Sequence, residues 1–410
     1  MQNKSTEVRF PMSSTIPSLV NDPAEAIRTA TRRIEPELID IRRDIHAHPE
    51  IGFEEVRTAG VVARELERLG IVHRTGIAGT GVVGLIEGGR PGPVLAIRAD
   101  MDALPIQEQT GLPFASQHPG KMHACGHDIH TATLLGVAAV LQQLAPQLAG
   151  TVKLVFQPAE EGLGGMARMI REGVMEGPQV DMALTLHNHP DIPVGRFGFA
   201  RGPSLAASDK FEIIVHGKSG HAAFPQYAVD PIVAAAQLVG MLQTVVSREV
   251  KPVHPVVVTV AAIHAGTAHN IIPDSCLLRG TVRTLHGEAQ EVAEAAMRRL
   301  CDGLAVSMRV RCELTYVRGV PALVNDDAVL DRVVLAVQRQ CGDVIGEVEA
   351  VMGGEDFALM ANLVPSFQLK VGSGQPGRAD DLHNSDYQPD EACIGYGVQA
   401  LARAALDILS

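Results

Sequence analysis

Short runs of branched apolar residues alternate with longer segments of helical spacing in roughly the first 190 residues, and this alternation restricts the fold most strongly. Strand-like runs occur at 81–86, 94–99, 151–157 and 182–186. Helical spacing covers 24–48, a segment from the capping residue Thr58 to Gly70, 129–144 and 164–171. Strands that alternate with helices in this way predict an α/β domain with a mostly parallel sheet.

The middle of the chain has a different order of elements. Strands and helices are expected in the order β-α-β-β-α-β at 210–216, 230–248, 255–264, 275–284, 288–304 and 308–316. This order is typical of a ferredoxin-like unit. The first pattern then returns, with a helix at 327–340, strands at 348–352 and 367–371, and a helix at 391–409. We therefore expect a loose N-terminal tail (1–23), a main domain (24–206 and 319–410) and an inserted domain (207–318).

Charge and composition exclude several classes of function. The 410 residues include 47 acidic and 35 basic side chains, a net charge of −12, which disfavours binding to nucleic acid. No uninterrupted apolar stretch is long enough to span a membrane, and the first residues lack the apolar core of a signal peptide. The six cysteines do not have the spacing of a disulfide framework, so a cytoplasmic location is expected.

The densest group of chemically active residues is MHACGHDIH at 122–130. Cys125 and His127 lie on either side of a glycine, immediately before a predicted helix. Thiolate and imidazole are preferred ligands of zinc-like ions, so this loop is a candidate metal site. A buried cysteine beside helix-capping histidines would give the same short pattern, and the motif alone leaves both interpretations open.

Polar residues also follow two further strands of the predicted sheet. Glu160 and Glu161 come after the strand at 151–157, and His187 comes directly after the strand at 182–186. Adjacent carboxylates are commonly a solvated pair, but here one could hold a metal while the other activates water. The carboxyl ends of parallel strands meet at one edge, where ligands bind in open α/β sheets. His383, in the polar segment DDLHNSD, completes the candidate set.

These residues belong to a longer series of motifs that together resemble a known family. The chain resembles the M20 metallopeptidases, specifically their aminoacylase-like amidohydrolase branch, which contains hippurate hydrolases and indole-acetyl-amino-acid hydrolases. The blocks that carry the resemblance are RRDIHAHPEIGFEE (42–55), RADMDALPIQE (98–108), MHACGHDIHTA (122–132), VFQPAEEG (155–162), LHNHP (186–190), GKSGHAAFPQ (217–226), GTAHNIIPD (266–274), GTVRT (280–284) and GGEDFA (353–358).

The resemblance implies a metal-dependent hydrolase that cleaves N-acyl amino acids, hippurate-like or related, into a carboxylic acid and a free amino acid. One or two divalent ions, zinc or manganese with cobalt as a further option, would be bound by Cys125, His127, Glu161, His187 and His383. Glu160 would be the general base for the water that the metal activates. Asp102 would orient the site. Asp100 stands where the wider family has a metal-binding histidine, which matches the Cys-x-His branch.

The resemblance also gives the inserted domain a role in dimerisation and as a lid. His221, supplied by the partner subunit in related members, would stabilise the developing oxyanion. Asn270 would be a second donor, and Arg283 would meet a substrate carboxylate. We therefore expect a homodimer or a higher homo-oligomer that acts on a small N-acyl amino acid, with no nucleic-acid or membrane partner. A dipeptidase-like peptidase, a hydrolytic deaminase and a non-catalytic metal-binding scaffold remain alternatives.

Overall fold

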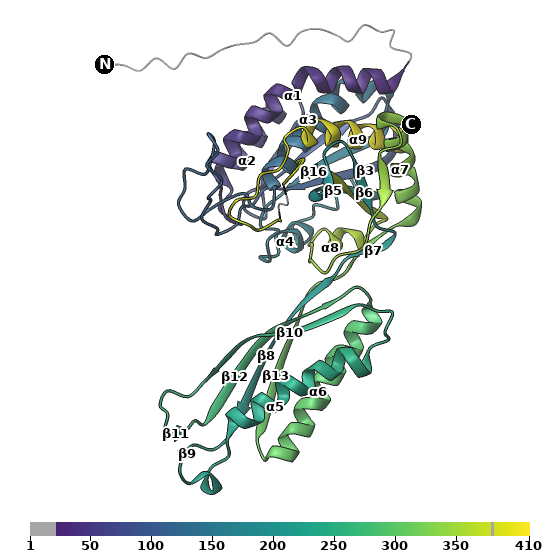
Figure 1. The fold of residues 1–410 in the computed structure, drawn as a ribbon. Coiled ribbons are helices and arrows are strands. Elements are labelled where there is room, and N and C mark those ends of the chain that lie inside the picture. Colours follow the sequence, from purple (N-terminus) through teal and green to yellow (C-terminus); the bar gives the residue numbers. More distant parts are fainter. Residues whose placement is uncertain (1–21, 379–380) are drawn as a thin grey trace, which may run out of the picture.

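The computed structural model describes residues 22–378 and 381–410 and divides them into a larger domain and an elongated inserted domain (Figure 1). The first 21 residues of the expected N-terminal tail lie outside the described residues. Helix α1 (Pro23–Ala47) begins one residue earlier than expected, because the Asp22 carboxylate accepts a hydrogen bond from the backbone of Ala24 at 2.9 Å.

The larger domain is built on one eight-stranded sheet. In sheet order its strands are β1 (Val72–Ile77), β2 (Gly81–Glu87), β4 (Ala149–Gln157), β3 (Arg90–Asp100), β5 (Met182–Pro193), β16 (Ser366–Gly374), β6 (Phe197–Phe199) and β15 (Ile345–Glu347). The four central strands, β4, β3, β5 and β16, run parallel to one another. The predicted α/β class with a mostly parallel sheet is therefore confirmed.

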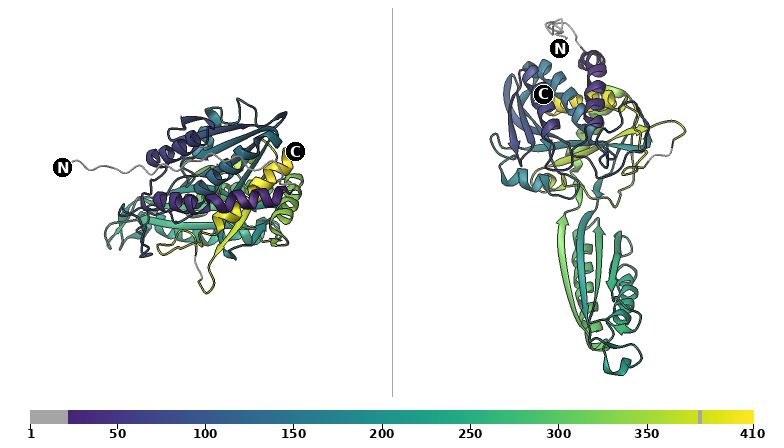
Figure 2. Two further views of the ribbon diagram at one scale, coloured as in Figure 1. Left: turned by 90° about the horizontal axis from the view of Figure 1, so that it is seen from above. Right: turned by 90° about the vertical axis from the view of Figure 1, so that its left-hand side faces the viewer.

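Helices cover both faces of this sheet (Figures 1 and 2). One face packs against α1, α2 (Val56–Arg68), α3 (His127–Leu144), α7 (Asp327–Cys341) and α9 (Cys393–Ile408). The other face packs against the short helices α4 (Gly165–Arg171) and α8 (Ala358–Ala361). Side chains alternate between the faces, so Leu95 and Ile97 lie in the first core while Ala96 lies in the second.

Helix α3 is long and apolar enough to resemble a membrane span. Together with the turn that follows it, the segment covers His127–Gln147, and 78% of its apolar window is buried inside the protein. The helix packs between the sheet and helices α1 and α9. It is therefore the central helix of the larger domain's core, which explains its length and composition.

The inserted domain contains β8 (Ala207–His216), α5 (Pro231–Thr244), β10 (Val256–Ala265), β12 (Ser275–Thr284), α6 (Gly287–Met308) and β13 (Arg311–Val320). Its four-stranded antiparallel sheet has the order β10-β12-β8-β13, with α5 and α6 packed on it. This is the ferredoxin-like arrangement that the element order predicts. Two short strands, β9 (Gly220–His221) and β11 (Ile271–Ile272), pair at the end farthest from the larger domain (Figure 1).

Short elements complete the chain. Strands β7 (Gly202–Leu205) and β14 (Leu323–Asn325) pair where the chain leaves the larger domain and returns to it. Brief helical turns occur at Ala145–Gln147, Pro225–Tyr227 and Val245–Glu249.

Three sequence expectations about local structure are wrong. Residues 348–352 form no strand beyond a single bridge at Val351, and β15 lies just before them. Thr58 does not cap α2, because the Glu50 carboxylate accepts the Arg57 and Thr58 backbone N–H groups at 2.9 and 2.8 Å. The strand expected from 308 begins at 311, because α6 continues to Met308 and Arg309 turns the chain with a φ of 58°.

Candidate metal centre

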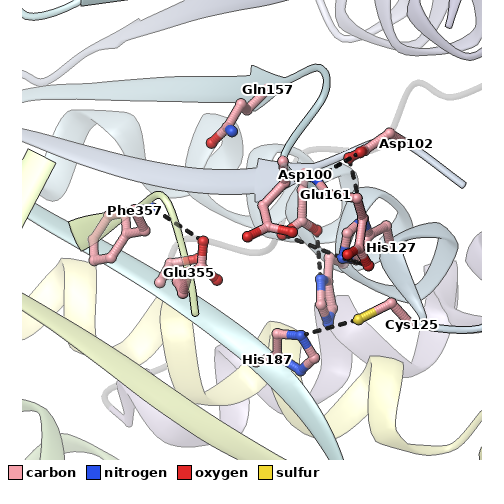
Figure 3. A network of polar contacts seen from close by, with 12 residues as sticks. Asp100, Asp102, Cys125, His127, Gln157, Glu161, His187, Glu355 and Phe357 are labelled. Atoms are coloured by element: carbon pink, nitrogen blue, oxygen red, sulfur yellow. Dashed lines mark hydrogen bonds and ion pairs between the residues drawn. The ribbon is translucent and has the colours of Figure 1, made fainter. Parts of the chain in front are cut away.

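The carboxyl ends of the central strands gather the candidate residues at one edge of the sheet (Figure 3). Strand β3 ends at Asp100, and β4 ends at Gln157, shortly before Glu160 and Glu161. His187, in contrast, lies inside β5 rather than after its end, which corrects the sequence expectation. The physical reason is that β3 pairs with β5 only as far as Thr185, whereas β16 pairs with β5 beyond that point.

A glycine turn places Cys125 and His127 at the centre of this edge. Gly126 has a φ of 90°, and a Cβ atom at this position would overlap the Asn188 side-chain amide. Cys125 Sγ lies 3.6 Å from His187 Nε2 and 3.4 Å from His383 Nε2. The turn therefore needs a glycine, and it directs the thiol towards two imidazoles.

The structure brings all five predicted ligand residues together. The ligand atoms of Cys125, His127 and His187 lie within 4.8 Å of one another, as do those of Cys125, Glu161 and His383. The two groups share the Cys125 thiol, and His383 Nε2 lies 3.2 Å from Glu161 Oε1. Five donors in two overlapping groups exceed the needs of one tetrahedral ion.

Unsatisfied buried atoms support a cation at this position. His127 Nε2 and Glu161 Oε1 are buried and form no hydrogen bond within the described residues, although Glu161 Oε1 has an ion-pair contact with His383 Nε2. Burial raises the pKa of the Cys125 thiol well above its usual range, so a thiolate here needs a positive charge beside it. A mixed set of thiolate, imidazole and carboxylate suits zinc, manganese or cobalt, so these residues fit the implied metal.

Two carboxylates lie beside the five donors. Burial, together with the charges of Glu355, Asp356 and Glu161, raises the pKa of Glu160 well above its usual range. A carboxylate that readily takes up a proton is suited to general-base chemistry. Asp102 Oδ1 lies 3.3 Å from His127 Nδ1, and its Oδ2 accepts the Glu161 backbone N–H at 2.9 Å. Asp102 therefore contacts both a predicted ligand and the backbone of a second one.

A buried arginine that the sequence reasoning missed supports the acidic side of the site. Arg98 lies 2.7 Å from Asp100, 3.0 Å from Glu355 and 3.2 Å from Asp356, and it donates to Gln157 at 2.7 Å. The available signal was a charged residue inside an otherwise apolar strand, because buried charges require partners. Glu355 and Asp356 belong to the GGEDFA block, which contributes to the family resemblance, but the sequence reasoning gave these two residues no role.

A cavity of about 640 Å³ opens above the candidate metal centre. Cys125, Glu160 and His383 line it from the larger domain, and Arg283 lines it from the inserted domain. Gly354 packs closely against Arg283, since a Cβ atom there would lie 3.1 Å from Arg283 Nη1 and 3.1 Å from Ser208 Cβ. The cavity therefore combines four of the five donors, all except His127, with a guanidinium group that can meet an anion.

Two of the predicted site residues are not near this cavity. His221 belongs to β9 and Asn270 immediately precedes β11, so both lie at the distant end of the inserted domain (Figures 1 and 2). Both are exposed to solvent. A single chain in this conformation therefore does not bring them to the candidate metal centre.

Comparisons with known proteins agree on the family of the chain. Residues 96–407 match the family described as Peptidase family M20/M25/M40. The chain is 41% identical over 382 residues to an N-acetylcysteine deacetylase of Bacillus subtilis (strain 168). This match covers 93% of this chain and 99% of that protein. It is also 38% identical over 378 residues to IAA-amino acid hydrolase ILR1-like 2 of Arabidopsis thaliana. That match covers 91% of this chain and 85% of the plant protein.

A solved structure extends the agreement to the fold. A Bacillus subtilis protein described as a dinuclear metal binding peptidase from the M20 family superposes with a TM-score of 0.83 at 38% identity. The match covers 92% of this chain and 99% of that one. The chain belongs to peptidase family M20/M25/M40, in its aminoacylase-like amidohydrolase branch, and is a hydrolase of amide bonds.

Proposed function

We propose that the chain hydrolyses N-acyl amino acids and releases a carboxylic acid and a free amino acid. The observation that carries this proposal is the cavity that is lined by four of the five metal-type donors, by Glu160 and by Arg283. An N-acyl amino acid has an amide carbonyl that can lie at the metal-type donors and Glu160, and a carboxylate that can pair with Arg283. The similarity to a deacetylase and to an amino-acid-conjugate hydrolase supports the same class of substrate.

The chain's own residues divide the work of the reaction. The ions would be held by Cys125, His127, Glu161, His187 and His383, and the shared thiol favours two of them. When bound, such ions lower the pKa of water and polarise an amide carbonyl. Glu160 accepts the proton of the attacking water and delivers it to the leaving amine. Asp102 fixes the orientation of the His127 ring through the contact at Nδ1.

The inserted domain would pair two subunits and act as a lid. Strand β10 is an edge strand with Val257 and Ile263 exposed, and α5 exposes Ile232 and Val233 beside it. Such an uncharged edge is suited to pairing with a second copy. In the dimer, His221 and Asn270 would reach the partner subunit's cavity, where they would donate to the oxyanion. All six cysteines are free, which supports a reducing, cytoplasmic location.

Mixing two inactive variants tests the shared site. Glu160→Gln and His221→Ala should each be inactive as homodimers. Mixed dimers contain one site with both residues intact, so an equal mixture should recover about a quarter of wild-type activity after subunit exchange. Absence of recovery, with exchange confirmed by mass spectrometry, would show that His221 does not act across subunits.

A substrate panel tests the proposed function as a whole. N-acetyl, N-benzoyl and indole-acetyl amino acids should be hydrolysed by enzyme loaded with zinc, manganese or cobalt. Glu160→Gln should abolish turnover while metal content, measured by mass spectrometry, stays near wild type. Dipeptides and aromatic amines in the same panel test the peptidase and deaminase alternatives. Lack of turnover with every compound and every metal would favour the scaffold alternative and contradict the proposal.

A further inference from the structure

Four lysine or arginine side chains are buried in the described part of the chain, namely Arg42, Arg98, Lys153 and Lys370. A buried cation is costly unless hydrogen bonds and opposite charges replace the lost water. Both arginines meet this requirement with at least two carboxylates each. The two lysines differ sharply from each other.

Lys153 shows how this protein satisfies a buried lysine with a structural role. Its Nζ donates to the carbonyl oxygens of Val174, Glu176 and Pro178 at 3.0, 2.7 and 2.7 Å. These three acceptors match the three donors of an ammonium group. Lys153 therefore fixes the segment that follows α4 and has no donor left for a ligand.

Lys370 is equally buried, with 2% of its surface exposed, but it is poorly satisfied. Its one hydrogen bond within the described residues goes to the carbonyl oxygen of Glu349 at 3.4 Å, which is longer than the usual range. Burial lowers the pKa of Lys370, and no carboxylate opposes that effect. At least two of its three donors therefore have no partner in the part of the chain that the structure describes.

The place of Lys370 in the sheet explains where these donors point. Lys370 on β16 is in register with His187 on β5, so the two side chains lie on the same face of the sheet. Both line the cavity above the candidate metal centre. His189, two residues further along β5, also lines the cavity, and its buried Nδ1 has no hydrogen-bond partner among residues 22–378 and 381–410. The nearest carboxylate oxygen to that atom, from Asp191, is 3.8 Å away.

We propose that Lys370, assisted by His189, binds a second carboxylate of the substrate, in addition to the one expected at Arg283. The preferred substrates are then N-acyl amino acids that carry two carboxylates. The second carboxylate belongs either to an acidic amino-acid side chain or to a dicarboxylic acyl group. This inference rests on the proposed function and narrows its substrate class.

Two matched substrate pairs distinguish the sources of the second carboxylate. N-acetyl-L-glutamate against N-acetyl-L-glutamine tests the amino-acid side chain, and N-succinyl-L-alanine against N-butanoyl-L-alanine tests the acyl group. We expect kcat/KM to be at least about tenfold higher for the charged member of one pair, because a charge-assisted hydrogen bond in a buried site is strong. The pair that shows the preference identifies the source.

Variants of Lys370 test whether this side chain causes the preference. Lys370→Met keeps the lysine side chain's shape up to Cε but removes the ammonium group. It should lower kcat/KM for the charged substrate about 10- to 100-fold, with less than about a threefold change for the neutral one. Lys370→Arg should retain most of the preference. Lys251→Met is the matched control, because Lys251 is exposed, pairs with Glu288 and does not line the cavity.

The outcomes separate this inference from the proposed function. If the wild type hydrolyses the neutral N-acyl amino acids but prefers neither charged substrate, the inference is wrong while the proposed function stands. If it hydrolyses none of the compounds, both are wrong. A merely structural Lys370 would give Lys370→Met a lower Tm and equal losses for all substrates, and that result would also overturn the inference.

Discussion

Replacing Arg98 tests whether one buried cation holds the acidic side of the site together. Arg98→Met removes the one arginine that Asp100, Glu355 and Asp356 share within the described residues and leaves these buried carboxylates without its positive charge. Removing one member of a buried ion pair costs about 3–5 kcal/mol. We therefore expect the free energy of unfolding to fall by at least about 3 kcal/mol, a large part of the roughly 5–15 kcal/mol that stabilises a protein.

Chemical denaturation of the metal-loaded enzyme measures this loss. Arg279→Met is the matched control, because Arg279 forms an exposed pair with Glu212 at 2.8 Å and should contribute less than about 1 kcal/mol. Arg98→Met combined with Asp356→Asn should recover part of the stability, because one of the opposing charges has been removed. The coupling between the two changes is expected to be about 1–3 kcal/mol.

The pH dependence of the loss in unfolding free energy gives a further check on the role of Arg98. Burial raises the pKa of Asp356 to about 7 even with Arg98 present, so without Arg98 this group takes up a proton still more readily. The loss caused by Arg98→Met should therefore be larger at pH 8 than at pH 6. A loss equal to that of Arg279→Met, with no recovery in the double variant, would refute the view that Arg98 balances the cluster.

Three further predictions follow from the site and its surroundings. Chelation should abolish hydrolysis and lower the Tm, and zinc, manganese or cobalt should restore both, as measured by activity and calorimetry. Burial lowers the pKa of His123 from 6.5 to about 4. Between pH 6.5 and pH 4 the His123 imidazole therefore binds a proton only in the unfolded chain, so the free energy of unfolding falls as the pH drops through this interval. His123→Phe should remove about 3 kcal/mol of that pH dependence in denaturation curves measured from pH 6.5 to pH 4. Gly354→Ala should raise KM for N-acyl amino acids with little change in kcat, because its Cβ would lie 3.1 Å from Arg283 Nη1 and from Ser208 Cβ and the guanidinium would have to shift; an unchanged KM would show that this shift does not disturb substrate binding.

The gathering of the candidate ligands could be predicted because a parallel sheet aligns the ends of its strands. Glu160 and Glu161 follow β4, and His127 begins the helix after the turn at Gly126, so strand order alone brings them close. The extension of β5 through His187 could not be predicted, because it depends on where β3 stops pairing and β16 continues. The capping of α2 by Glu50 could not be predicted either, because the accepting carboxylate lies outside the helix, in a segment whose position depends on the tertiary fold.

Buried lysines show most clearly where sequence reasoning stops. Lys153 in TVKLVFQ and Lys370 in SFQLKVG both interrupt apolar strands, and both side chains lie on the face of the sheet that carries Arg98. Nothing in either run distinguishes a lysine that fixes a loop from one that faces a ligand. The difference comes from the loop at 174–178, whose carbonyl oxygens surround Lys153, whereas the cavity above the metal centre leaves Lys370 without comparable acceptors. A buried charge therefore indicates function when the fold that encloses it leaves its donors unused beside a cavity.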